Sequence, residues 1–126
     1  MTKLTEKAEE KRNEIKRKIA TDVESYEGDN KQYNIEDLNE ELKDMVTEMG
    51  FMDMDWSMWL FTKSKKIINK SRSMYLVPIY TLSENPEIVP GGLLQEGYSI
   101  HITNEPWLLP KTVVVFIFPH TRSAVS

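Results

Sequence analysis

The stretch FMDMDWSMWLF, residues 51–61, decides the fold, because the spacing of apolar residues changes where it begins. Up to Gly50 they recur every three or four positions, as on one face of a helix. Within residues 51–61 apolar and polar residues alternate, which is typical of a strand with one dry and one solvated face. The dry face is predicted to carry Met52, Met54, Trp56, Met58 and Leu60, and the solvated face Asp53, Asp55 and Ser57.

A helix is predicted immediately before this strand, over residues 34–50. Asn34 stands where the residue that caps a helix N-terminus belongs, and Gly50 where a left-handed residue closes the C-terminus. Between them the apolar residues share one helical face, formed by Ile35, Leu38, Leu42, Met45, Val46 and Met49.

A longer amphipathic helix is predicted at the N-terminus, over residues 1–27. Its apolar stripe is narrow and is expected to break at Lys11 and Arg12, and Gly28 follows its end. The stripe contains Leu4, Ala8, Ile15, Ile19, Val23 and Tyr26.

Further strands are predicted in the second half of the chain. Residues 75–82 and 113–118 are apolar on both faces, while residues 98–103 alternate. Pro78 has no N–H to donate to a neighbouring strand, so residues 75–82 are expected to form an edge strand or to contain a bulge.

Helices followed by strands favour an α+β fold, with two N-terminal helices before a small, mainly antiparallel sheet of three to five strands. The length of 126 residues predicts one domain. The sheet is expected to span residues 51–118, and residues 119–126 are expected to be a tail.

Composition excludes several kinds of site. The chain has no cysteine, which rules out disulfides, thiolate zinc sites and cysteine nucleophiles. The longest apolar run, residues 113–118, is far shorter than the about 20 residues that span a bilayer. No apolar signal segment is visible near the N-terminus, so we expect a cytoplasmic protein without a membrane partner.

Charge is strongly segregated along a chain whose net charge is −4. Residues 24–55 carry eleven acidic and two basic side chains, a net charge of −9. Residues 56–72 carry five basic side chains and no acidic one, a net charge of +5. Asymmetry of this kind can steer a charged partner.

The basic segment, residues 62–72, is one candidate for a nucleic-acid interface. Its lysines and Arg72 are flanked by Trp59, Phe61 and Tyr75, so it could follow a phosphate backbone and stack bases. The acidic character of the whole chain argues against a general nucleic-acid-binding protein.

Asp53 and Asp55 raise the alternative of a metal-dependent enzyme acting on a nucleotide or phosphoester. Together with His101 on another predicted strand, they could hold Mg²⁺ or Mn²⁺ if the two strands were neighbours. The alternation with Met and Trp is fully explained by one solvated strand face, however. No metal, cofactor or catalytic residue is therefore predicted, and an enzyme is disfavoured.

A protein interface is the favoured interpretation, because the strands carry more two-sided apolar surface than two helices can cover. The contact is predicted to centre on large apolar residues with charged residues at its rim. The apolar members are Trp59, Phe61, Trp107 and Leu108, and the charged members are Lys65, Lys66, Glu41 and Asp44.

The predicted partner is a second copy of the chain or a larger protein. The cysteine-free composition, rich in Lys, Glu, Asn and Ile, is typical of an AT-rich microbe or its phage. An inhibitor or regulator, working in the host cytoplasm if the chain is phage-encoded, and a virion or assembly component both fit this prediction.

Overall fold

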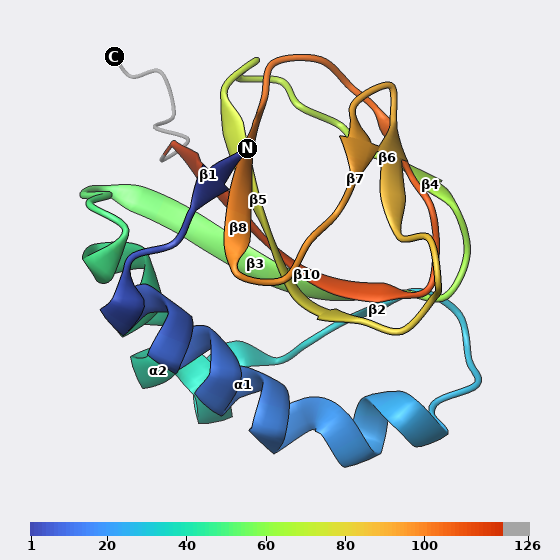
Figure 1. Ribbon diagram of the computed structural model, residues 1–126, viewed down its shortest axis with the longest axis horizontal. Helices are drawn as coiled ribbons and strands as arrows, with labels where there is room; N and C mark the ends of the chain where they lie inside the picture. Colours follow the sequence, from blue (N-terminus) through green and yellow to red (C-terminus); the bar gives the residue numbers. More distant parts are fainter. Residues whose placement is uncertain (120–126) are drawn as a thin grey trace.

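The computed structural model describes residues 1–119; residues 120–126, most of the predicted tail, lie outside the described residues. Within residues 1–119 the elements form three layers, with helices on one side of a six-stranded sheet and a four-stranded sheet on the other (Figure 1). The helices are α1 (Glu6–Ser25), the 3-10 helix η1 (Ile35–Leu38) and α2 (Asn39–Glu48). No helix of this part of the chain is long and apolar enough to cross a membrane.

The two sheets are antiparallel at every neighbouring pair. The main sheet has the order β1 (Thr2–Lys3), β8 (Tyr98–Ile102), β5 (Met74–Thr81), β10 (Thr112–Pro119), β3 (Met54–Phe61) and β2 (Lys31–Gln32). The small sheet has the order β4 (Lys65–Lys66), β9 (Trp107–Leu108), β6 (Glu87–Val89) and β7 (Gly92–Leu93).

The predicted α+β class, with two α-helices and antiparallel pairing, is confirmed. The predicted sheet of three to five strands is wrong, because the described residues form sheets of six and four strands. The helices also do not both precede the strands, since β1 lies before α1 and β2 lies between α1 and α2. Most of the strands that the prediction missed have only two residues, too few for an alternating pattern to show.

The predicted second helix has its capping residues at Asn34 and Gly50, but Asn34 caps η1 and α2 begins later than predicted. The Asn34 Oδ1 accepts a hydrogen bond from the Glu36 N–H at 3.1 Å, which caps η1, and the α-helix begins only at Asn39. At the C-terminus the Phe51 N–H donates to the Val46 carbonyl at 3.3 Å. The Gly50 N–H donates to the Thr47 carbonyl at 2.9 Å, and Gly50 has a φ of 89°. These two bonds are the Schellman arrangement that ends a helix.

Replacing Gly50 with valine should lower the free energy of unfolding by about 1–2 kcal/mol, because a β-branched residue is strained at positive φ. A Cβ at this position meets no atom within 4 Å, so backbone strain is the only cost. Gly50→Asn should cost less, since asparagine tolerates this conformation. Urea unfolding of the three proteins checks this, and a neutral valine variant would contradict the C-cap assignment.

The turn after Gly50 also corrects the predicted start of the strand. Asp53 has a φ of 55°, and β3 begins only at Met54. Met52, predicted on the dry face, is 84% exposed, because the turn places it outside the sheet.

The buried stripe of helix α1 does not break at Arg12, contrary to the prediction. Arg12 is only 4% exposed and continues the buried stripe between Ala8 and Ile15. Its Nη1 donates to the Ile79 carbonyl at 2.8 Å. Strand β5 has an extra residue at this point, because Val113 pairs with Tyr80 and Val114 with Pro78.

The buried guanidinium therefore satisfies a carbonyl that the β-bulge leaves without a strand partner. Of the two predicted consequences of Pro78, the bulge is confirmed and the edge position is wrong. Strand β5 lies inside the main sheet, between β8 and β10.

Glu96 completes the polar cluster around Arg12. Its Oε1 accepts from Lys16 Nζ at 2.7 Å and from Arg12 Nη1 at 3.1 Å, and its Oε2 accepts from the Thr81 N–H at 2.9 Å. Burial alone would raise the pKa of this carboxyl, but these hydrogen bonds and the two positive charges outweigh burial. The pKa of Glu96 consequently lies below its ordinary value.

This lowered pKa makes Glu96 a source of acid sensitivity. Stability from such a group is present above its unfolded-state pKa of about 4.3 and is lost as pH falls through the lower folded-state value. Between pH 6 and pH 3, Glu96→Gln should therefore lose stability less steeply than the native protein. Urea unfolding at several pH values measures the slopes, and equal slopes would show that Glu96 is not linked to folding.

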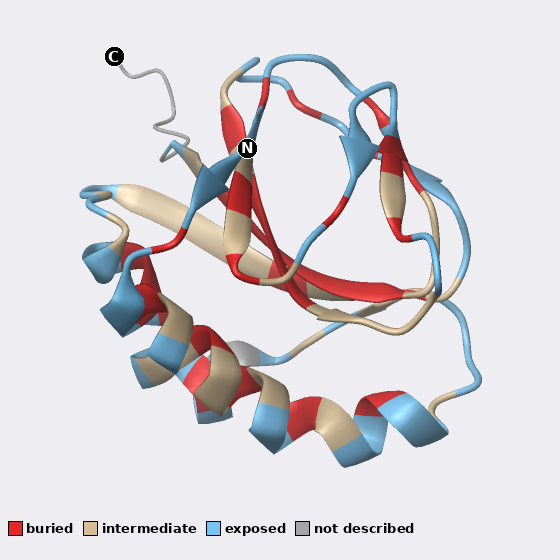
Figure 2. Cartoon of the chain, viewed as in Figure 1, coloured by how far each residue is buried: buried red, intermediate tan, exposed pale blue. Residues whose placement is uncertain are grey.

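Both faces of the main sheet are covered within the molecule, and Figure 2 shows buried residues along β5 and β10. The first core joins α1 and α2 to one face and contains Ile15, Leu42 and Met58. The second core joins the other face to the small sheet and contains Leu76, Ile88 and Leu108. The small sheet thus buries apolar strand surface that the sequence assigned to a partner.

Candidate functional site

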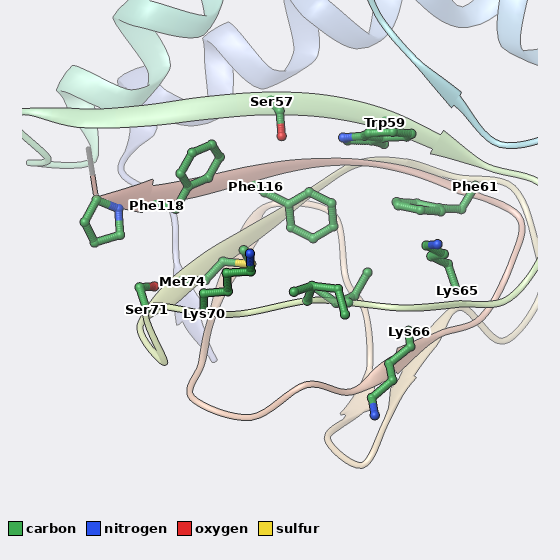
Figure 3. A pocket seen from close by; sticks show the side chains of 13 residues that line it. Ser57, Trp59, Phe61, Lys65, Lys66, Lys70, Ser71, Met74, Phe116 and Phe118 are labelled. Atoms are coloured by element: carbon green, nitrogen blue, oxygen red, sulfur yellow. The ribbon is translucent and has the colours of Figure 1, made fainter. Parts of the chain in front are cut away.

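The candidate site is a cavity of about 590 Å³ on the second face of the main sheet. One wall is formed by β3 and β10, and the facing wall by the segment from Lys65 to Met74 (Figure 3). Its described lining residues are Ser57, Trp59, Phe61, Lys65, Lys66, Ile67, Ile68, Lys70, Ser71, Met74, Phe116, Phe118 and Pro119. A volume of this size is within the range of small-ligand and side-chain pockets.

Aromatic rings form the sheet wall of the cavity. Strand alternation places them there, because Trp59 and Phe61 lie on the face of β3 that faces away from the helices. The rings of Trp59 and Phe61 stack with centroids 5.9 Å apart and planes 16° apart. Phe116 of β10 meets Phe61 edge-on at 6.0 Å. This wall offers flat apolar surface to an incoming group.

Lysines border the opposite side of the cavity. Figure 3 shows the side chains of Lys65 and Lys70 extending toward the aromatic wall and that of Lys66 extending the other way. Within residues 1–119 none of these three lysines forms an ion pair. None of the described lining residues is acidic. The cavity therefore has apolar walls with a positive border.

Asn69 holds the lysine-bearing segment in place. It is 3% exposed, and its Nδ2 donates to the Ile102 carbonyl at 2.9 Å and to the Asn104 carbonyl at 3.1 Å. Its backbone N–H donates to Glu105 Oε2 at 2.9 Å. The sequence gives no signal of this role, because a buried asparagine in a basic segment has the same pattern as an exposed one.

Four of the predicted interface residues line this cavity: Trp59, Phe61, Lys65 and Lys66. Leu108 does not, because it is fully buried in the second core. Trp107 is 50% exposed and pairs with Lys66 and Val89 on the outer face of the small sheet.

The predicted acidic rim residues lie elsewhere, at the contact between the two helices. Glu41 of α2 forms an ion pair with Lys18 of α1, and Asp44 of α2 lies 3.7 Å from Lys11 of α1. The hydrogen bond from Lys18 lowers the pKa of Glu41. These two carboxylates thus serve helix packing.

The structure does not bring Asp53, Asp55 and His101 together. Asp55 is on β3 and His101 is on β8, with β10 and β5 between them. The His101 ring stacks on Tyr75 at 4.6 Å, and its Nε2 is 3.0 Å from the Ser73 hydroxyl. Within residues 1–119 no cluster of three His, Asp or Glu side chains could hold a metal ion. The geometric premise of the metal-dependent enzyme is therefore absent from this part of the chain.

The basic segment is only partly available to a ligand. Lys63 forms an ion pair with Asp29, and Arg72 lies in a turn with a φ of 57°. The hydrogen bond from Lys63 lowers the pKa of Asp29. Lys65 and Lys70 remain as the cations directed at the cavity.

Few polar side chains other than the lysines surround the cavity. Besides the lysines, the described lining offers only the hydroxyls of Ser57 and Ser71. The Ser71 hydroxyl already donates to the Ser73 carbonyl at 2.9 Å. Within the described lining no hydrogen bond joins either serine hydroxyl to a lysine.

Comparison with protein-family models, with curated proteins and with solved structures found no match to this chain.

Proposed function

We propose that the protein is a non-enzymatic interaction protein that docks on a larger protein through the cavity between its sheets. In this proposal a large apolar side chain of the partner enters the cavity and packs on Trp59 and Phe61. The observation that carries it is the aromatic, acid-free lining of a cavity of about 590 Å³. Buried aromatic residues in such pockets supply most of the energy of protein interfaces.

The proposal names a larger protein as the partner whose side chain enters the cavity. The small sheet covers much of the apolar strand surface from which either a second copy or a larger protein was predicted. The cavity remains as apolar surface that is open to a partner.

The proposal includes the biological role and the cellular location that were predicted from the sequence. The protein would inhibit or regulate the protein that it binds, or join it in an assembly. It would do so in the cytoplasm, or in the host cytoplasm if a phage encodes it. The absence of cysteine supports a reducing compartment.

Selection from a random peptide library, followed by fluorescence anisotropy with the enriched peptides, tests the proposal. Peptides with a large apolar residue should bind, and Trp59→Ala should lower their affinity about tenfold or more. Ser57→Phe should also block peptide binding, because Ser57 lies in the cavity wall and a larger side chain would fill the cavity.

Trp107→Ala is the matched control, since it removes an exposed indole outside the cavity and should leave the affinity within about twofold. Failure to enrich any peptide over an unrelated protein would overturn the proposal. So would equal binding by the native protein, Trp59→Ala and Ser57→Phe.

A further inference from the structure

We infer that the partner's segment carries carboxylates beside the apolar side chain that enters the cavity. This inference rests on the proposed function and names the chemistry of the partner. The apolar side chain would pack against the aromatic wall, and the carboxylates would lie against the ammonium groups of Lys65 and Lys70 (Figure 3).

The lysines around the cavity have no acidic partner among the described residues. Lys65, Lys66 and Lys70 form no ion pair within residues 1–119, whereas nearby Lys63 is already paired with Asp29. Because the described lining contains no acidic residue, nothing there neutralises the lysines at the border. The carboxylates of a partner would form ion pairs with these lysines, and a partner with lysines would be repelled.

The backbone that carries the lysines is held in position before the partner arrives. Strand β4 pairs Lys65 with Leu108, which is fully buried. The Ile67 N–H donates to the Pro106 carbonyl at 2.8 Å, and Asn69 fixes the following residues. A fixed backbone lowers the entropy cost of binding and makes the positions of the charges selective.

An acidic peptide fits the cavity better than a single-stranded nucleic acid. Sequence-specific recognition of bases relies on polar groups beside the stacking rings, and here the described lining offers only two serine hydroxyls and lysines. A phosphate backbone is bound by cations along its length, whereas among the described residues only Lys65 and Lys70 are directed at this cavity.

Three fluorescent probes test the inference by anisotropy. Two are synthetic peptides with the same central Phe-Leu, flanked on both sides by aspartates in one and by lysines in the other. The third is an oligothymidine. The acidic peptide should bind about tenfold more tightly than the basic one. Its affinity should fall on addition of about 0.5 M salt.

The lysines offer a matched set of variants. Lys65→Glu with Lys70→Glu should weaken binding of the acidic peptide about tenfold. Lys43→Glu, on α2 in the helix layer on the other side of the main sheet, should change it less than about twofold. All three lysines are exposed, so thermal unfolding should stay at the native value in every variant.

The outcomes separate this inference from the proposed function. Equal binding of both peptides, abolished by Ser57→Phe, would overturn the acidic partner and leave the cavity as a docking site. An equal loss in Lys43→Glu would overturn it as well. Tighter binding of the oligothymidine would replace it with a nucleic-acid site. If neither peptide binds and the library also yields none, both proposals fall.

Discussion

Replacing Arg12 with alanine should lower the free energy of unfolding by about 3–5 kcal/mol. The guanidinium is 4% exposed and donates to the Ile79 carbonyl at the bulge and to Glu96. Its removal leaves a buried carbonyl without a donor and leaves Glu96 with one positive partner fewer. Because small domains are stable by only about 5–15 kcal/mol, a loss of this size would be a large fraction of the total.

Urea unfolding measures this effect, with Arg17→Ala as the control. Arg17 is exposed on the same helix, so its loss should change stability by less than about 0.5 kcal/mol. Arg12→Lys should fall between the two, since an ammonium keeps the charge but loses the planar fork of the guanidinium. A cost below about 1 kcal/mol for Arg12→Ala would contradict the role assigned to the buried side chain.

Replacing Leu108 with alanine should lower the free energy of unfolding by about 3 kcal/mol, because the side chain is fully buried in the second core. Leu108 belongs to β9, which pairs with both β4 and β6. A cavity at this position would loosen the small sheet from the main sheet. The same urea experiment measures it.

Trp107 is the neighbouring control for Leu108. It lies on the outer face of the same two-residue strand and is 50% exposed. Trp107→Ala should cost less than about 1 kcal/mol even though it removes a larger side chain. A greater cost for Trp107→Ala than for Leu108→Ala would contradict the packing of the small sheet.

The helix α2 and the strand β3 could be predicted because their patterns are local. The cap at Asn34 and the left-handed Gly50 depend only on nearby residues, and the alternation from Met54 onward follows from the geometry of a strand. The bulge at Pro78 followed from the missing N–H of proline.

The role of Arg12 could not be predicted, because its partners are distant in the sequence. In the sequence, Arg12 interrupts the apolar stripe of α1. Its burial depends on the carbonyl of Ile79, 67 positions away, which accepts its hydrogen bond. The small sheet was missed for a related reason. Its β4, β7 and β9 have two residues each, so no periodic pattern marks them, and β4 pairs with β9, which lies far along the chain.

Half of the predicted interface lines the cavity. Trp59 and Phe61 broke the alternation of the strand, and that exception was the signal of a second apolar face. Lys65 and Lys66 were found from charge alone, which could not tell that the two side chains extend in different directions. Lys70, Phe116 and Phe118 were not named as site residues, because only the packing of β10 against β3 brings the aromatic rings to the cavity.

The indole N–H signals of the three tryptophans test the central claim most directly. Trp59 lines the cavity, Trp56 packs against the helix-side core, and Trp107 lies on the outer face of the small sheet. In ¹⁵N-labelled protein, titration with the aspartate-flanked peptide should shift the Trp59 signal and leave the other two in place. A shift of the Trp107 signal with Trp59 unchanged would contradict the claim that the cavity between the sheets is the binding site.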